Sequence, residues 1–326
     1  MNRSITILGA GLVGSVLSVL LRKKGYEVTI YERRPDLRVS QIGAGRSINL
    51  AMSTRGWKAL ELAGLREDIE SIAIPMTGRY LHQDDGSAAF QPYGKNGEAI
   101  YSVSRGELNK KLMDLAEANG VKIYFNQTCD HVDLQHKQLH FKDEAGHKNI
   151  VDYDLLFGAD GAFSALRKSM TMLDRTDYQQ FYINSGYKEL CIPPSATGEF
   201  CMEHNALHIW PRHNFMMIGL PNTDKSFTCT LFFPFEGTPS FDSLQTDAEI
   251  RAFFEQHFPD AVPMMPTLME DYKNNPTSSL VTVKVAPWVY QSSACLIGDA
   301  AHAIVPFYGQ GMNAGFEDCS VLFELL

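Results

Sequence analysis

The sequence predicts an α/β protein in which a second, mainly antiparallel β domain is inserted into a domain with a parallel sheet. Three observations support this prediction. A glycine-rich strand–turn–helix pattern opens the 326-residue chain, apolar residues alternate with period two through the middle, and a second glycine-rich pattern lies near residue 300. The glycine-rich patterns are typical of strands followed by helices, whereas the alternation is typical of antiparallel strands with one buried face.

The opening pattern is a short β-branched strand followed by Gly9-Ala10-Gly11-Leu12-Val13-Gly14, which has the form G-x-G-x-x-G. In this motif Gly9 permits the tight turn, Gly11 lets the backbone approach a pyrophosphate, and Gly14 lets the helix pack on the strand. The next residues are apolar at helical spacing, so the start of a helix would face the phosphates. We therefore expect a Rossmann-like dinucleotide site.

A second predicted strand, Glu27 to Tyr31, runs directly into Glu32. An acid at this place, about 20 residues after the glycines, accepts hydrogen bonds from a ribose 2′-OH. It disfavours a 2′-phosphate, so the bound nucleotide is expected to be FAD or NAD rather than NADP. Arg33, in the charged turn that follows, is a further cofactor-binding candidate.

Two arginines downstream are candidates for anion contacts. Gly43-Ala44-Gly45-Arg46 predicts a loop folded against a ligand, with Arg46 facing a phosphate or a ring edge; a solvated surface loop is the alternative. Ser104-x-x-Glu107 predicts the capped start of a helix. Arg105 lies in the first turn of that helix, where the helix dipole disfavours a cation, so we expect an anionic partner for it.

The inserted domain is predicted from a change of pattern. Residues 75–98 contain short, turn-rich, aromatic segments, and residues 176–284 show the period-two alternation, so both segments are assigned to this domain. The first domain is then discontinuous and consists of residues 1–74, 99–175 and 285–326.

Acidic residues follow two further predicted strands. A buried strand at residues 153–158 runs into Asp160-Gly161, and another at 294–297 runs into Gly298-Asp299. Next comes the glycine-rich loop Gly309-Gln310-Gly311-Met312-Asn313, and a helix is predicted from Ala314 to Leu326.

Composition excludes several classes of function. The net charge of −9 and the pI near 5.6 argue against a nucleic-acid surface and against binding to acidic membranes. The six cysteines are scattered and form no metal-binding pattern with histidines, so we expect no metal and reduced thiols in a cytoplasmic protein. No apolar run approaches the roughly 18 residues of a membrane span, so no membrane association is expected.

Three elements together, Gly9 to Glu32, Asp160-Gly161 and Gly298-Asp299, resemble the FAD-dependent aromatic hydroxylases of the p-hydroxybenzoate hydroxylase fold. Longer stretches are similar to the kynurenine 3-monooxygenase family, among them Gly45-Arg46-Ser47-Ile48-Asn49-Leu50-Ala51, Ser102-Val103-Ser104-Arg105, Leu207-His208-Ile209-Trp210-Pro211-Arg212 and Gly298-Asp299-Ala300-Ala301-His302. The similarity extends over essentially the whole chain. The C-terminal helical region of that family is expected to be absent, because its members continue past Leu326.

The resemblance implies a set of residues at the FAD site. It places Glu32 on the adenosine ribose, Arg105 facing the cofactor, and Asp299 on the ribityl hydroxyls, with the Gly309–Asn313 backbone against the isoalloxazine. A helix that begins near Gly311 would stabilise negative charge on the reduced ring. The cofactor-binding candidates are Gly9, Gly11, Gly14, Glu32, Arg33, Arg46, Ala51, Arg105, Asp160, Asp299, Gly309, Gly311, Met312 and Asn313.

The resemblance also implies a substrate site. Arg79 and Tyr93 fall where the family binds the amino-acid carboxylate of its substrate, and a guanidinium suits this task because it binds a carboxylate bidentately. Phe232 or Phe233, Phe307 and Tyr308 are candidate walls for the substrate ring, with core packing as the alternative. No acid–base residue is assigned as catalytic, because the flavin carries the chemistry.

The implied reaction is the hydroxylation of L-kynurenine to 3-hydroxy-L-kynurenine by NADPH and O2, through a flavin C4a-hydroperoxide, within tryptophan degradation and NAD biosynthesis. Two alternatives stay open. The protein could be a single-component flavin hydroxylase of another phenol or aniline, or an FAD-binding fragment without turnover. An NAD-linked dehydrogenase would leave Gly298-Asp299 and the following glycine-rich loop without a role.

Overall fold

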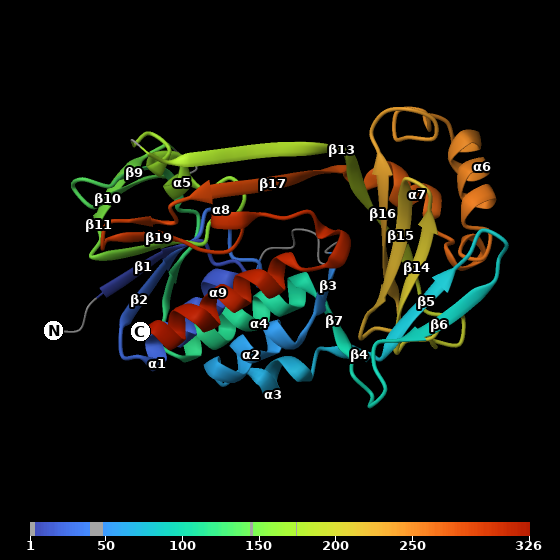
Figure 1. Cartoon of the computed structure of the whole chain (residues 1–326), viewed down its shortest axis with the longest axis horizontal. Helices are drawn as coiled ribbons and strands as arrows, with labels where there is room; N and C mark the ends of the chain where they lie inside the picture. Colours follow the sequence, from blue (N-terminus) through green and yellow to red (C-terminus); the bar gives the residue numbers. More distant parts are fainter. Residues whose placement is uncertain (1–3, 40–47, 144–145, 174) are drawn as a thin grey trace.

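The computed structural model describes residues 4–39, 48–143, 146–173 and 175–326. Two large sheets lie in opposite halves of the molecule, and a long two-stranded ribbon runs between them (Figure 1). The predicted α/β class with an inserted, mainly antiparallel sheet is confirmed. The domain boundaries inferred from the sequence remain a prediction.

The first sheet has the strand order β18-β19-β12-β1-β2-β8. Its strands are β1 (Ser4–Leu8), β2 (Glu27–Tyr31), β8 (Lys122–Tyr124), β12 (Leu155–Gly158), β18 (Val289–Tyr290) and β19 (Ala294–Leu296). All neighbours pair in parallel except β18 and β19 at one edge. The strands that precede the glycine turn, Glu32, Asp160 and Asp299 therefore point the same way, and these residues gather at one edge of the sheet.

Helices cover one face of this sheet (Figure 1). They are α1 (Leu12–Lys23), α2 (Thr54–Ala63), α3 (Arg66–Glu70), α4 (Arg105–Ala118) and α9 (Gly311–Leu325). Their shared core contains Val16, Leu20, Leu112 and Phe316, all fully or almost fully buried. Beside them lies a small sheet of β3 (Asn49–Met52), β4 (Ile74–Met76) and β7 (Ile100–Ser104).

The other face is covered by a sheet of β9 (Thr128–Asp133), β10 (Gln138–Lys142) and β11 (Lys148–Asp152), together with α5 (Ala165–Met170). Leu139, Phe141 and Leu166 form the core on this side. The first domain therefore has three layers, with the parallel sheet in the middle.

The second large sheet has the order β17-β13-β16-β15-β14-β5-β6. Its strands are β5 (Gly78–His82), β6 (Ala88–Pro92), β13 (Asp177–Ile192), β14 (Ala206–Arg212), β15 (Phe215–Pro221), β16 (Phe227–Pro234) and β17 (Ser278–Ala286). Only β14 and β5 pair in parallel. The helices α6 (Asp247–His257) and α7 (Leu268–Asn274) and the short turn η1 (Val262–Met264) cover one face, over a core rich in phenylalanine.

Two features differ from the sequence-based expectation. The apolar pattern predicts this helix from Ala314, whereas it begins at Gly311, near the start that the family resemblance implies. Part of the expected glycine-rich loop is therefore helical; the local pattern missed the start because glycine has a low helix propensity. The ribbon of β13 and β17 was not predicted as a unit. The first six residues of β13 are all exposed, so they lack the alternation that marks a half-buried strand.

All six cysteines are free thiols, two of them buried and four half-buried. No helix among the described residues is both long enough and apolar enough to cross a membrane.

Candidate cofactor site

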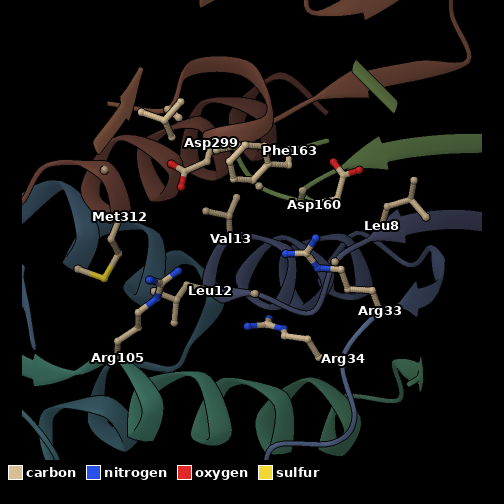
Figure 2. A pocket seen from close by; sticks show the side chains of 18 of the residues that line it. Leu8, Leu12, Val13, Arg33, Arg34, Arg105, Asp160, Phe163, Asp299 and Met312 are labelled. Carbon is tan, nitrogen blue, oxygen red and sulfur yellow. The ribbon is translucent and has the colours of Figure 1, made fainter. Parts of the chain in front are cut away.

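A cavity of about 410 Å³ lies beside the glycine turn, where the parallel strands end. Ten of the predicted cofactor residues line it: Gly9, Gly11, Glu32, Arg33, Arg105, Asp160, Asp299, Gly309, Gly311 and Met312. Arg33 and Arg34 lie toward one end of the cavity, and Arg105 and Met312 toward the other, with Asp299 above them (Figure 2). The lining residues thus come from segments more than 300 positions apart in the chain.

The glycine turn shapes one wall. Gly9 has a φ of +100°, and a Cβ at this position would lie 2.6 Å from the carbonyl oxygen of Ala159. A Cβ on Gly14 would lie 2.1 Å from the carbonyl oxygen of Gly9, so the helix can approach the turn only with glycine there. Gly11 has no atom within 4 Å of its Cβ position and faces the cavity. The first-turn N–H groups of α1 are therefore open to an anion.

Glu32 is almost completely buried at the end of β2. Its carboxylate accepts hydrogen bonds from the Ala10 N–H at 2.8 Å, from the Arg34 N–H at 2.9 Å and from the Arg34 Nε at 2.8 Å. Burial alone would raise the pKa of Glu32, but these hydrogen bonds outweigh it and lower the pKa below its ordinary value. Glu32 therefore stays ionised and can still accept a further hydrogen bond.

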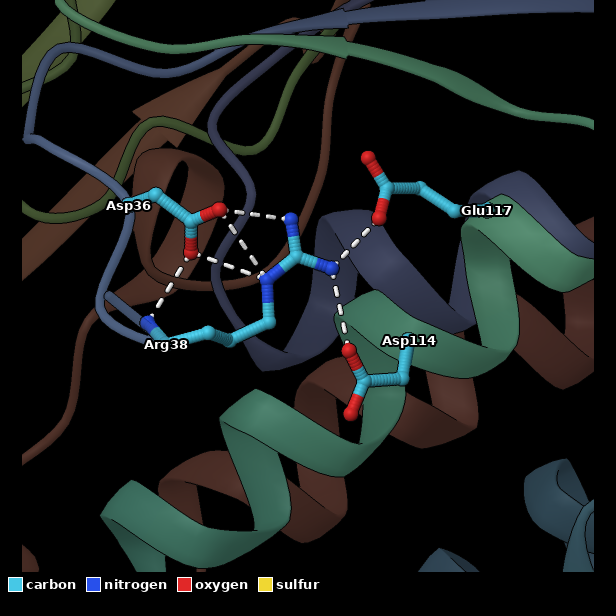
Figure 3. A network of polar contacts seen from close by, with 4 residues as sticks. All are labelled: Asp36, Arg38, Asp114 and Glu117. Carbon is cyan, nitrogen blue, oxygen red and sulfur yellow. Dashed lines mark hydrogen bonds and ion pairs between the residues drawn. The ribbon is translucent and has the colours of Figure 1, made fainter.

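Arg38 anchors the turn that carries Arg33 and Arg34. Its guanidinium pairs with Asp36 in the same turn at 2.7 Å, and with Asp114 at 3.0 Å and Glu117 on α4 (Figure 3). Hydrogen bonds from these carboxylates raise the pKa of Arg38. The network fixes the segment after β2 to α4, so the arginines at this end of the cavity are held by a neighbouring helix.

The Asp160 side chain has one buried carboxylate oxygen without a hydrogen-bond partner among the described residues. Its Oδ2 accepts the Ala165 N–H at 2.7 Å, whereas its buried Oδ1 has no partner among the described residues. Burial raises the pKa of this carboxyl group. Because buried polar atoms are nearly always hydrogen-bonded, an acceptor that lines a cavity without a partner indicates a ligand with a donor there.

Arg105 and Asp299 lie on the same part of the cavity wall (Figure 2). Burial raises the pKa of Asp299, and the positive charges of Arg105 and His302 oppose this shift. Asp299 therefore interacts electrostatically with Arg105, for which an anionic partner was expected, although no direct hydrogen bond joins them. A polar ligand between these side chains would satisfy both charges.

Three predicted cofactor residues lie behind the wall. Asn313 is fully buried in α9; its amide donates to Ala51 O at 2.8 Å and Gly309 O at 3.1 Å, and its Oδ1 accepts the Ser53 N–H at 2.8 Å. Ala51 contacts Gly309 from β3, and Gly14 packs against the glycine turn. These residues hold the lining segments in place. Arg46 lies outside the described residues.

The predicted substrate residues lie outside this cavity. The rings of Phe232 and Phe307 meet edge to face with centroids 5.3 Å apart, whereas Tyr308 is 87% exposed. Arg79 is exposed, and its Nε donates to Gln91 at 3.1 Å. Tyr93 lies close to Arg79; burial raises the pKa of the tyrosine, and the arginine partly offsets this effect.

The sheet register shows that Arg79 and Phe232 share a face. Strand pairing aligns Arg79 with Gln91 and with Leu207, and Phe232 with Met216 and Tyr187. This face is opposite the one that packs on α6, because the alternating residues Trp210, Met217 and Leu231 belong to the core beneath that helix. Phe307, which touches Phe232, is flanked by the cavity residues Pro306 and Gly309.

Sequence reasoning missed several residues of the site. Tyr187 on β13 and Ser279, Leu280 and Val281 on β17 line the cavity from the ribbon. Tyr187 also lies 6.3 Å from Phe232, ring centroid to ring centroid, so it joins the cavity to the substrate-candidate face. No local pattern marks these positions, because only the pairing of two strands about 90 residues apart brings them there.

The residues present fit FAD. The cavity is lined by the starts of α1 and α9, which suit a pyrophosphate and an electron-rich ring respectively, and by an orphaned acceptor in Asp160. Among the described residues the guanidinium of Arg33 has no hydrogen-bond or ion-pair partner. A dinucleotide with charges and donors along its length would satisfy these groups.

Comparisons with known proteins agree with this fit. The FAD binding domain family matches residues 2–326. The chain is 50% identical over 324 residues to a kynurenine 3-monooxygenase of Christiangramia forsetii, covering 99% of this chain and 72% of that protein. A kynurenine 3-monooxygenase of Flavobacterium johnsoniae is 51% identical over 323 residues, with 99% and 72% covered. That of Dictyostelium discoideum is 50% identical over 326 residues, with 99% and 70% covered.

Solved structures show the same fold. A crystal structure of 2-methyl-3-hydroxypyridine-5-carboxylic acid oxygenase superposes with a TM-score of 0.80 over 99% of this chain and 82% of that one, at 21% identity. At this identity the likeness concerns the fold alone. Sequence identity near 50% over the whole chain shows more: the chain belongs to the kynurenine 3-monooxygenase family of FAD-dependent monooxygenases.

Proposed function

We propose that the protein hydroxylates L-kynurenine to 3-hydroxy-L-kynurenine with FAD as cofactor and with NADPH and O2 as co-substrates. The observation that carries this proposal is the roughly 50% identity to kynurenine 3-monooxygenases over 99% of the chain. The cavity with its adjoining aromatic sheet face supports it. We further infer a cytoplasmic location from the six free cysteines.

We propose that the cavity residues hold FAD along its length. Glu32 accepts a hydrogen bond from the adenosine ribose, and the start of α1 at Gly11 receives the pyrophosphate. Asp299 accepts hydrogen bonds from hydroxyl groups nearer the flavin, and Asp160, which lies toward the Arg33 end of the cavity, accepts one nearer the adenosine half (Figure 2). The first turn of α9, at Gly311 and Met312, lies against the ring and stabilises negative charge on it. When bound, FAD supplies the electron transfer and the oxygen chemistry.

The proposed substrate site is the sheet face between Arg79 and Phe232. The aromatic rings of Phe232, Phe307 and Tyr187 would pack against the substrate ring close to the cofactor cavity. The exposed guanidinium of Arg79, with Tyr93 beside it, would bind the amino-acid carboxylate. These residues orient the ring and exclude water from the reacting carbon; none of them transfers a proton in this scheme.

We also propose that cofactor and substrate are bound by different domains. Residues 1–74, 99–175 and 285–326 would bind the cofactor, and residues 75–98 and 176–284 would bind the substrate. Tyr187 and the β17 residues at the cavity belong to the second group, so the two domains would meet at the flavin end.

Steady-state turnover tests the substrate assignment. FAD-loaded protein is incubated aerobically with NADPH and, separately, with L-kynurenine, anthranilate, p-hydroxybenzoate and tryptophan, and the products are identified by mass spectrometry. We expect NADPH oxidation to be stimulated most by L-kynurenine and to yield 3-hydroxykynurenine. Product from another aniline or phenol in preference to kynurenine would contradict the substrate, and no product from any of them would contradict the activity.

A further inference from the structure

One face of α9 lies along the turn that presents Asp299. A Cβ on Gly311 would lie 3.9 Å from Asp299 Oδ1, and a Cβ on Gly315 would lie 3.4 Å from Gly298 Cα. One turn later, Asp318 Oδ2 accepts the Gly298 N–H at 2.9 Å. Positions 311, 315 and 318 are spaced by four and three residues, so they form a single stripe on the helix.

Asp318 holds both ends of this turn. Its Oδ2 also pairs with His302 Nε2 at 2.6 Å, and His302 ends the short helix α8 (Asp299–His302) that begins at Asp299. The Asp318 and His302 side chains are only 19% and 22% exposed, and the ring of Trp288 lies 5.0 Å from that of His302. The hydrogen bond to Asp318 raises the pKa of His302, so the pair is favoured in its charged form.

The turn needs an external support. Gly298 has a φ of +62° and a ψ of −141°, a conformation that does not belong to a regular helix or strand. Asp299 follows it directly; its side chain is open to the cavity, and desolvation by the surrounding protein raises its pKa. The helix that Asp299 begins has only four residues and no side-chain cap, so the contacts from Asp318 on the fifteen-residue α9 hold its two ends.

We propose that Asp318, acting through Gly298 and His302, is a positioning residue that aims Asp299 and the first turn of α9 at the flavin half of FAD. This inference deepens the proposed function, because it rests on Asp299 and α9 holding the cofactor. Asp318 itself does not line the cavity. Its contribution is to keep the acceptor and the start of the helix in one fixed relation.

Ligand affinities of the FAD-free protein test the proposal. FAD affinity is measured from flavin fluorescence and ADP affinity by calorimetry, for wild type, D318A, D318N and H302Q. D318A loses both contacts and should raise the Kd for FAD by at least about tenfold, while D318N and H302Q each keep one contact and should raise it less. The Kd for ADP should stay within twofold in all variants, because ADP contacts only the adenosine half.

Glu324→Gln is the matched control. Glu324 is on the same helix and forms an exposed ion pair with Lys58 at 2.7 Å, so this variant changes the charge equally without touching the turn. We expect it to bind FAD as the wild type does. The absorption spectrum of bound flavin should shift in D318N and H302Q but not in E324Q, because only the former change the surroundings of the ring.

The outcomes separate three cases. Weaker FAD binding with unchanged ADP binding supports the proposal. FAD affinities of D318A, D318N and H302Q all within twofold of wild type would overturn it, as would an equal loss of ADP and FAD affinity, which indicates a general structural role. If D318A does not fold, D318N and H302Q decide. Wild-type protein that fails to bind FAD would instead contradict the proposed function itself.

Discussion

Replacement of Asn313 by alanine should destabilise the protein where α9 packs behind the cavity wall. The fully buried amide makes three hydrogen bonds, with Ala51 O, Gly309 O and the Ser53 N–H. They tie α9 both to the preceding loop and to the chain at the end of β3. The substitution removes all three bonds, so the three backbone groups lose their partner, and it leaves an unfilled space in place of the amide.

The expected loss follows from these contacts. Three typical hydrogen bonds contribute about 3 kcal/mol net, and a backbone group that finds no new partner adds roughly 1–2 kcal/mol to the loss. Asn313→Ala should therefore lower the free energy of unfolding by about 3–5 kcal/mol, a large part of a typical stability of about 5–15 kcal/mol. Asn313→Asp keeps an acceptor for Ser53 but directs negative charge at two carbonyl oxygens, so it should be at least as destabilising.

Urea unfolding of the FAD-free protein, followed by far-UV circular dichroism, measures this loss. Asn119→Ala is the control, because Asn119 makes a single amide hydrogen bond at an exposed helix end, to Leu115 O at 2.7 Å. We expect that control to lose less than about 1 kcal/mol. A loss for Asn313→Ala no larger than that of Asn119→Ala would refute the reasoning.

Three further predictions concern other parts of the site. Arg79→Ala should weaken L-kynurenine binding by about 1.5–3 kcal/mol, the scale of a lost hydrogen bond to a charged group, with FAD affinity unchanged. Titration of the flavin absorbance with kynurenine measures this loss, and an unchanged Kd for kynurenine would remove Arg79 from the substrate site. Gly11→Ala should fold normally, because its Cβ would meet no atom within 4 Å, but should bind FAD at least about tenfold more weakly. Gly14→Ala, whose Cβ would lie 2.1 Å from Gly9 O, should instead lower the stability of the fold. Thermal unfolding and flavin titration measure the two effects, and equal losses of stability in both variants would contradict the prediction. The folded pKa of Glu32 lies below its ordinary value of 4.5, so its contribution to stability is present above pH 4.5 and is lost as the pH falls through the folded pKa. Glu32→Gln should lower stability near neutral pH and flatten its fall in acid below the ordinary pKa. An unchanged acid dependence in chemical unfolding would count against this.

Local patterns were enough to predict the first half of the site. The glycine turn, the strand Glu27–Tyr31 and the acid after it follow one another in the sequence and depend on nearby residues only. The predicted and observed bounds of that strand agree. Asp160 and Asp299 could be found in the same way, since each follows a buried strand whose carboxyl end reaches the same sheet edge.

Contacts that depend on distant pairing could not be predicted. Tyr187 reaches the cavity only because β13 pairs with β16 and β17, and no local pattern distinguishes it from the other residues in the half-buried part of that strand. Asp318 looks like an ordinary helix residue until the structure places it against Gly298. The family resemblance places the Asn313 backbone against the cofactor, which stays a prediction; the structure adds that the Asn313 side chain is buried and hydrogen-bonded to Ala51 O and Gly309 O.

Anaerobic reduction tests the central claim most directly. FAD-loaded protein is mixed with NADPH under nitrogen, with and without L-kynurenine, and the loss of flavin absorbance is followed before oxygen is admitted and the product identified. We expect flavin reduction that kynurenine accelerates, followed by formation of 3-hydroxykynurenine in an amount that approaches that of the reduced flavin. Protein that takes up no FAD, or reduced flavin that reoxidises without any hydroxylated product, would contradict it.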